Sequence, residues 1–219
     1  MNDNNQHIEN IKRFESLLMS VKRKGMQALL TAMIRGTDFY TAPASQSYYK
    51  AYPGGLLEHS LNVYEILYRK ATEGGSVLAA ELAKEQISQE SLILIGLLHD
   101  IYKVNRYVAG EKNIKEYDPE LVADMLERSP REVKTELDGR RYFWKTKPVY
   151  TVEDQFPLGT TDKSIMMIQP YIRLTWDEMM GIKWANGPEN MDLFIGSAKK
   201  YPIALAAYEA KMEAMYFLD

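Results

Sequence analysis

Two histidines, His59 and His99, and the aspartate that directly follows the second, Asp100, are the residues best suited to chemistry in this 219-residue chain. A third histidine, His7, is expected to be solvent-exposed near the N-terminus. Imidazole nitrogens and a carboxylate are better ligands for Zn, Mn, Fe, Co or Ni than for Mg or Ca, which prefer sites made of oxygen atoms alone. A single histidine on an apolar helix is more often a satisfied core residue. The three residues together give a candidate metal site, with a purely structural core as the alternative.

Apolar helices are predicted to carry both halves of this site. His59 lies in a helix expected over residues 56–71, where apolar residues recur at three- and four-residue steps. His99 and Asp100 lie near the end of an apolar helix expected over 89–102, with Ser88 as its N-cap. The loop at 37–55 is rich in Pro and Gly and long enough to border a site. Further helices are expected at 8–21, 26–35, 77–84, 118–128, 162–171, 176–185 and 202–218.

A short β-structure is predicted after Pro130. Residues 133–137 and 140–144 indicate a hairpin with a type I′ turn at Asp138-Gly139, and residues 149–152 indicate a third strand. Basic residues flank the aromatic residues 142–144, namely Lys134, Arg140, Arg141, Lys145 and Lys147. Such a cluster suits nucleotides or single strands, but a solvated strand face over core aromatics is the simpler interpretation. The expected result is one mainly helical domain over 8–219, with a hairpin insertion at about 132–152 and a flexible tail at 1–7.

Composition excludes several classes of protein. The net charge of −3 provides no basic field for duplex nucleic acid. The absence of cysteine excludes disulfides and thiolate metal ligands. No apolar run approaches the roughly 18 residues of a membrane span, and the polar N-terminus holds no signal-peptide core. These features predict a cytoplasmic protein with no membrane partner.

The phrases around the candidate ligands resemble a known family. They read GGLLEHSLNV at 54–63 and LLHDIYKVN at 97–105, and TDFYTAPAS at 37–45, DQFPLG at 154–159, LTWDE at 174–178 and YPIAL at 201–205 agree with them. The chain is similar, from about residue 8 to its end, to the HD-domain metal-dependent phosphohydrolases, and more narrowly to a bacterial and phage branch. The resemblance implies an all-α HD fold with one or two divalent metals that hydrolyse a phosphoester, in a bacterial cell or a phage-infected host.

His59, His99 and Asp100 match the family pattern, but the second half of that pattern is replaced. Thr160, Ala185 and Tyr208 stand where the family has histidines, and Lys211 stands where it has an aspartate. An ammonium at about 4–5 Å from a divalent cation is repulsive by several kcal/mol, even at an effective dielectric near 20. A two-metal centre is therefore not expected. One partial site for Mn, Fe, Zn, Co, Ni or Mg, or no metal at all, is the expectation.

Lys211 leads to a specific hypothesis, in which its ammonium takes the place of the metal and pairs with Asp100. Together with Lys103, it would form a cationic floor for a phosphate or a nucleotide. The alternative is that Lys211 reaches solvent from a decayed site. The expected ligand contacts are Lys103, Lys211, Tyr208 and Thr160. Asp100 and Lys103 are the residues expected to act if any catalysis is retained.

Three classes of function follow from these residues. The first is an HD-fold protein that has lost or reduced catalysis and binds a nucleotide, another phosphate-bearing small molecule, or a protein partner. The second is a phosphodiesterase or nucleotidase that uses one metal at His59, His99 and Asp100. The third is a protein-interaction scaffold. Lys211 and Ala185 favour the first and third classes over the second, whereas the retained residues favour the first and second.

Overall fold

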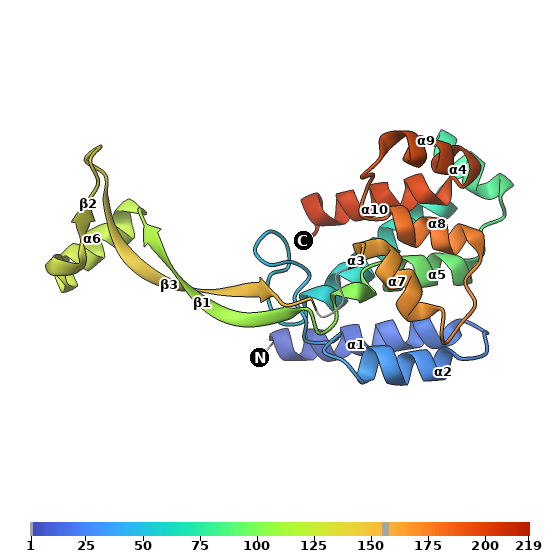
Figure 1. The fold of residues 1–219 in the computed structure, drawn as a ribbon, viewed down its shortest axis with the longest axis horizontal. Helices are drawn as coiled ribbons and strands as arrows, with labels where there is room; N and C mark the ends of the chain where they lie inside the picture. Colours follow the sequence, from blue (N-terminus) through green and yellow to red (C-terminus); the bar gives the residue numbers. More distant parts are fainter. Residues whose placement is uncertain (1, 155–157) are drawn as a thin grey trace. The chain divides into compact units, whose positions relative to one another are not determined.

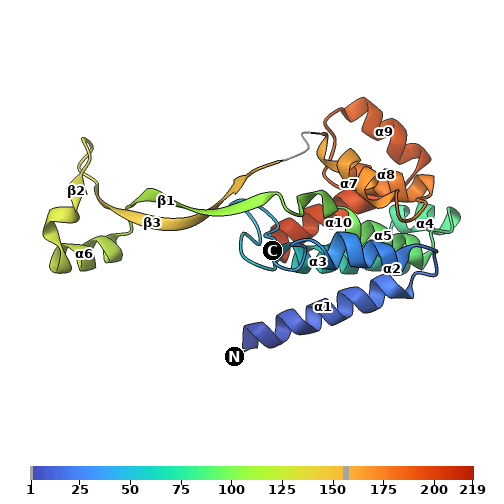
Figure 2. The same cartoon turned by 60° about the horizontal axis from the view of Figure 1, so that its bottom comes forward.

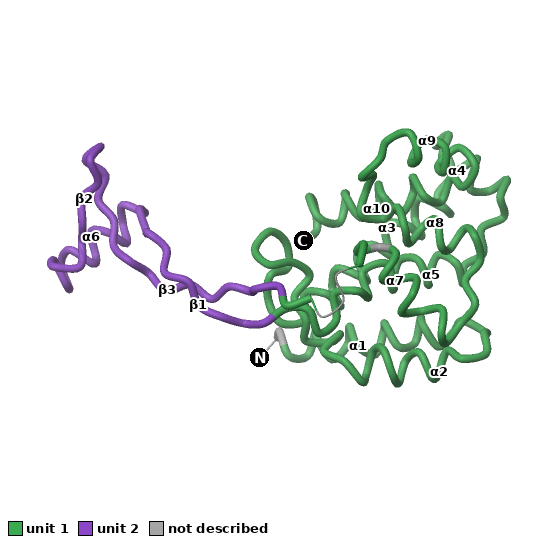
Figure 3. The backbone as a smooth tube through the Cα atoms, in the orientation of Figure 1, with its two compact units in different colours: residues 1–107, 153–219 green, residues 108–152 purple. Residues whose placement is uncertain are grey.

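The computed structural model describes residues 2–154 and 158–219 and divides the chain into two compact units (Figure 3). The helical unit consists of the residues up to 107 and from 153 onward, and the inserted unit consists of residues 108–152. The described helices of the helical unit are α1 (Asn2–Ser20), α2 (Met26–Leu29), η1 (Leu30–Arg35), α3 (Gly55–Thr72), α4 (Val77–Lys84), α5 (Gln89–Leu98), η2 (Ile101–Lys103), α7 (Thr160–Ile168), α8 (Trp176–Trp184), α9 (Met191–Lys200) and α10 (Ile203–Phe217). The predicted fold class, all-α with a small β insertion, is confirmed.

Four helices surround the core of the helical unit. Helix α3 packs on α5 and α10, and α8 packs on the same two helices (Figures 1 and 2). Helix α5 is one of these four, and every residue from Ser91 to Leu98 is buried. Gly96 permits the close approach of α5 to α3, since a Cβ there would lie 2.5 Å from the Tyr64 Cα. The helix that directly precedes the His-Asp pair is therefore buried along most of its length.

The end of α5 differs from the prediction of a continuous helix to residue 102. The helix ends at Leu98, and the Asp100 backbone departs from helical geometry before η2 begins. Ser164 from α7 stabilises this break. Its hydroxyl donates to the carbonyl of His99 at 2.8 Å and accepts the Tyr102 N–H at 3.3 Å. A side chain from a distant helix thus satisfies backbone groups at the break.

The inserted unit contains a three-stranded sheet in the order β1-β3-β2. Its elements are β1 (Tyr107–Glu116), α6 (Pro119–Arg128), η3 (Pro130–Glu132), β2 (Lys134–Thr135) and β3 (Arg141–Val152). Strand β1 was not predicted, and it moves the start of the insertion from about 132 to about 108. Its side chains are exposed or half-buried on both faces, so the sequence lacks the alternation of apolar and polar residues that would indicate a strand. Residues 149–152 belong to β3 rather than to a separate strand.

The predicted hairpin is present, but its turn is of another type. Lys134 pairs with Tyr142 and Thr135 with Arg141, in antiparallel register. Only Gly139 has a positive φ, of 84°, whereas a type I′ turn requires a positive φ at both central residues. The Gly139 N–H donates to the Glu136 carbonyl at 3.0 Å, which makes a three-residue loop with the glycine in the left-handed position.

Two further expectations are corrected at the level of helices. Helix α1 begins at Asn2, so the tail predicted at 1–7 is helical over its described residues. Gln6 supports this turn through a side-chain hydrogen bond to Asn10, and the ring of His7 packs against the turn at Gly54. Helix α9 was not predicted, and three of its large apolar residues, Met191, Leu193 and Ile195, are exposed. In the part of the chain that the structure describes, no helix has the length and apolar character needed to cross a bilayer.

Candidate functional site

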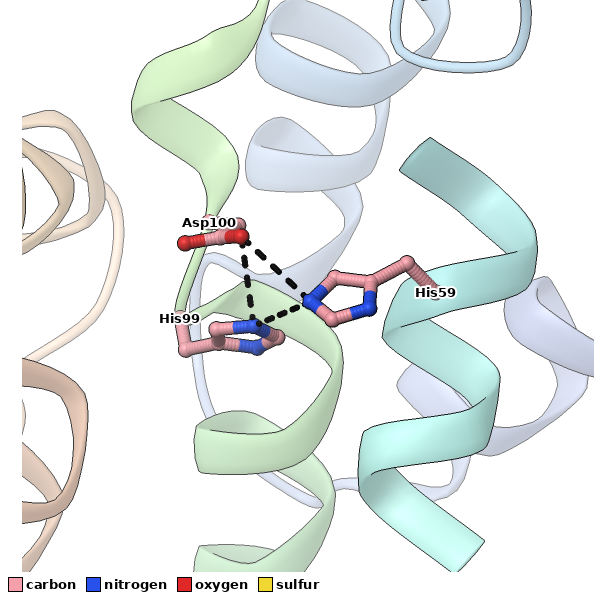
Figure 4. A group of neighbouring side chains, drawn as sticks. All are labelled: His59, His99 and Asp100. Carbon is pink, nitrogen blue, oxygen red and sulfur yellow. Dashed lines mark hydrogen bonds and ion pairs between the residues drawn. The ribbon is translucent and has the colours of Figure 1, made fainter. Parts of the chain in front are cut away.

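His59, His99 and Asp100 converge in the interior of the helical unit (Figure 4). His59 projects from α3, whereas His99 and Asp100 follow directly on α5. The Nε2 atoms of the two histidines are 3.3 Å apart. The Asp100 Oδ2 lies 3.5 Å from the His59 Nε2 and 3.4 Å from the His99 Nε2. All three side chains are fully buried.

The second nitrogen of each imidazole has its own partner. The Nδ1 of His99 donates to the carbonyl of Gly96 at 2.9 Å, because a carbonyl can only accept. Burial lowers the pKa of His99 to about 4, so its ring is neutral and its Nε2 carries a lone pair. The Nδ1 of His59 lies 2.5 Å from the Oδ2 of Asp219. Both rings therefore present Nε2 to the centre of the cluster.

The three facing atoms have the spacing of ligands around one metal ion. Ligand atoms held about 2.0–2.1 Å from a tetrahedral Zn²⁺ lie about 3.3–3.4 Å from one another. The observed separations of 3.3, 3.4 and 3.5 Å fit this geometry. A buried His-His-Asp set of this kind could hold one divalent ion through His59 Nε2, His99 Nε2 and Asp100 Oδ2.

Two lysines share the carboxylate of Asp100. The Nζ of Lys211 lies 2.8 Å from Oδ1 and 2.7 Å from Oδ2, and the Nζ of Lys103 lies 2.7 Å from Oδ2. This contact confirms the predicted pairing of Lys211 with Asp100 and excludes the solvent-facing alternative, because Lys211 is buried. Burial alone would raise the pKa of Asp100, but the two ammonium groups hold it well below its ordinary value.

The two lysines differ in how well their charge is compensated. Burial alone would lower the pKa of Lys103, but Asp100 raises it well above its ordinary value. At Lys211 the effect of burial prevails and lowers the pKa to about 8. One carboxylate offers a single negative charge to two ammonium groups, so both cannot be fully neutralised.

Lys103 also fastens the long loop at 37–55 to the site. Its ammonium donates to the carbonyl of Ala44 at 2.5 Å and to the hydroxyl of Tyr49 at 2.8 Å. The ring of Tyr49 lies 5.0 Å from that of His59, measured between centroids, and burial raises the pKa of Tyr49 to about 12. The loop borders the site, as its length indicated. The donor capacity of Lys103 is taken up by protein groups.

The structure adds residues that sequence reasoning missed. Asn186 accepts a hydrogen bond from Lys211, and its amide nitrogen lies 3.4 Å from Asp100 Oδ1. It directly follows Ala185, the buried alanine at a position where the family has a histidine. Asn62 and Asp219 lie behind His59, joined by a 2.9 Å hydrogen bond. Asn62 stands three residues after His59, a helical spacing that could have drawn attention to it.

The remaining predicted contacts lie further out. Thr160 and Asn186 both line a cavity of about 310 Å³, together with Tyr102. Tyr208 packs its ring on Phe194, 5.7 Å away between centroids. Their roles as ligand contacts stay predictions. Part of the DQFPLG phrase, residues 155–157, lies outside the described residues.

The basic and aromatic cluster of the inserted unit has protein partners of its own. Tyr142 and Phe143 are buried, whereas Trp144 is about half exposed. Lys145 pairs with Glu116 at 3.2 Å and Arg140 with Asp138 at 2.7 Å. These contacts favour a solvated strand face over a nucleic-acid surface.

Comparison with known proteins agrees with the motif. The family model described as HD domain matches residues 56–147. A dihydroneopterin 2′,3′-cyclic phosphate phosphodiesterase of Methanocaldococcus jannaschii is 32% identical over 76 residues, which is 35% of this chain and 28% of that protein. The chain thus matches little more than a quarter of that relative's length. No solved structure matches. The residues that match the HD-domain model include His59, His99 and Asp100, and the buried cluster that they form lies inside a helical fold.

Proposed function

We propose that this protein binds a phosphate-bearing small molecule, of the nucleotide class, beside Asp100, and that its hydrolytic activity is lost or strongly reduced. The observation that carries the proposal is the contact of Lys211 with both carboxylate oxygens of Asp100, at 2.8 and 2.7 Å. A lysine on α10 thereby supplies positive charge where the family's pattern would place an aspartate.

The two ammonium groups around Asp100 favour the binding of an anion over the binding of a metal cation. Lys103 and Lys211 both contact Oδ2, so a metal ion at this oxygen would meet two ammonium groups. At an effective dielectric near 20, each ammonium within about 5 Å would oppose the ion by several kcal/mol. A phosphate group would instead be attracted by the ammonium groups of Lys103 and Lys211.

The cavity beside Asn186 offers a route for such a ligand. Asn186 contacts both Asp100 and Lys211, and it also lines the cavity of about 310 Å³. This volume is at the lower end of those of small-molecule sites. A phosphate that displaced the Asn186 amide from Lys211 would gain a charge-assisted hydrogen bond.

A phosphohydrolase with one metal is the second candidate, favoured by the spacing of the three ligand atoms. A bound divalent ion would supply Lewis acidity and an activated water. His59, His99 and Asp100 would hold it, and Lys211 would have to yield part of its contact with Asp100. Of these two candidates, the one-metal enzyme requires the larger rearrangement of charge.

The two candidates are separated by metal content and ligand binding. Protein purified without chelator is analysed for metals, and a nucleotide panel is tested for turnover with added Mn²⁺ and for thermal stabilisation without it. Metal-free protein that a nucleotide stabilises supports the proposal, provided that the effect is lost in Lys211→Ala and kept in Lys199→Ala, a change at an exposed lysine.

Two outcomes would contradict the proposed binder. Stoichiometric metal with turnover that Asp100→Ala abolishes would establish the enzyme instead. Protein with neither metal nor nucleotide binding would leave the interaction scaffold as the remaining class.

A further inference from the structure

The carboxylate of Asp219 lies beyond the end of α10 and contacts two side chains of α3, those of His59 and Asn62. Its Oδ2 lies 2.5 Å from the Nδ1 of His59, and its Oδ1 accepts a hydrogen bond of 2.9 Å from the amide of Asn62. Its backbone N–H donates to the carbonyl of Ala214 at 2.9 Å. The carboxylate is therefore fixed from both the backbone and the side-chain end.

Asp219 lies on the side of the imidazole opposite to the cluster. It contacts Nδ1, whereas Nε2 of the same ring faces His99 and Asp100 at 3.3 and 3.5 Å. Asp219 therefore does not substitute for the carboxylate that Lys211 replaces. It acts on the cluster through His59.

We propose that Asp219 is a positioning residue, which holds His59 with the proton on Nδ1 and the lone pair of Nε2 directed at His99 and Asp100. An ionised carboxylate only accepts hydrogen bonds, so the ring nitrogen that faces it must carry the proton. Hydrogen bonds from the outer nitrogen of a histidine fix its tautomer and ring orientation and raise the basicity of the inner nitrogen.

The same arrangement occurs at the second histidine with a different acceptor. His99 donates its Nδ1 proton to the carbonyl of Gly96 at 2.9 Å. Both rings thus direct Nε2 at the centre of the cluster. The groups that fix them, the Asp219 carboxylate and the Gly96 carbonyl, come from different parts of the chain. Helix α10 contributes to both sides of the cluster, with Lys211 on the Asp100 side and Asp219, past the end of the helix, on the His59 side.

The tautomer is measured directly by long-range ¹H–¹⁵N correlation spectra of the metal-free protein, in which the chain's three histidines can be assigned by single substitutions. His59 is expected as the Nδ1–H form in the wild type. Asp219→Ala should convert it to the Nε2–H form or a mixture, and Asp219→Asn should restore the Nδ1–H form, because the amide oxygen still accepts. The control is Asp192→Ala, at an exposed aspartate on α9.

Titration with Co²⁺ alone gives the second readout and rests on the one-metal candidate function. Asp219→Ala should weaken Co²⁺ binding by about 10- to 100-fold, the usual effect of removing such a partner, and Asp219→Asn should weaken it less. If the wild type binds no Co²⁺, the one-metal function fails, and the tautomer measurement alone decides the role of Asp219.

A merely structural role for Asp219 predicts a different result. It would lower thermal stability in Asp219→Ala and leave both the His59 tautomer and any Co²⁺ affinity unchanged. That outcome, or a wild-type His59 in the Nε2–H form, would overturn the proposal.

Discussion

Lys211 and Asp100 form a fully buried ion pair in which one ammonium contacts both oxygens of one carboxylate, at 2.8 and 2.7 Å. The pair joins α10 to the second residue after α5. Breaking a buried pair leaves one charge uncompensated and is strongly destabilising, by about 3–5 kcal/mol. Lys103 moderates this cost for Asp100, because it contacts the same carboxylate at 2.7 Å.

The first prediction concerns this pair. Lys211→Ala and Asp100→Ala should each lower the free energy of unfolding, and the double variant should lose less than the sum, with a coupling of about 1–3 kcal/mol. Urea denaturation of the four proteins gives the cycle. Additive losses would show that the two groups do not interact in solution.

A second prediction reverses the charge at position 211. Lys211→Asp should raise the affinity for Mn²⁺, because it removes a repelling ammonium worth several kcal/mol at about 4–5 Å and supplies another carboxylate. Calorimetric titration measures the change. Lys199→Asp adds the same charge difference at an exposed position on α9 and should leave the affinity nearly unchanged. Equal effects of the two variants would indicate only a general change of charge.

A third prediction tests the attachment of the loop at Tyr49. Tyr49→Phe removes the hydroxyl that accepts from buried Lys103 at 2.8 Å, and it should lower the free energy of unfolding by about 1–3 kcal/mol. Tyr48→Phe is the matched control, because the neighbouring tyrosine is 92% exposed and should tolerate the change. Similar urea midpoints for the two variants would contradict the proposed anchoring of the loop.

A fourth prediction concerns acid stability and Glu178. Burial alone would raise its pKa, but Arg23, the Thr175 N–H and Ser91 lower it below its usual range, and the two terminal guanidinium nitrogens of Arg23, Nη1 and Nη2, donate to its carboxylate at 2.7 and 2.5 Å. A carboxyl whose pKa is depressed in the folded state stabilises the fold above its unfolded pKa of about 4.3, and this contribution is lost as the pH falls through the folded value.

Glu178→Gln should therefore lower the free energy of unfolding by about 3 kcal/mol at pH 7, and by less at a pH below 4. Urea denaturation at several pH values measures the difference. The control is Asp177→Asn, at a half-buried neighbour on the same helix. A loss that does not depend on pH would exclude the ionised Glu178 as its cause.

The sequence alone predicted most of the helical unit and half of its site. Helix boundaries follow from local patterns, such as the apolar run of α5 and the capping box formed by Thr175 and Glu178 at the start of α8. The family resemblance identified His59, His99 and Asp100. The pairing of Lys211 with Asp100 could be predicted because Lys211 occupies the position at which the family pattern has an aspartate.

Tertiary structure alone decided how the cluster is surrounded. Asp219 and His59 are 160 residues apart, and Asn186 and Asp100 are 86 residues apart, so no local pattern reports their contacts. The break after α5 depends on Ser164 from another helix, and β1 lacks a buried face that would mark it in the sequence. Local patterns encode which residues form a helix, whereas the partners of a buried polar group are set by how those helices pack.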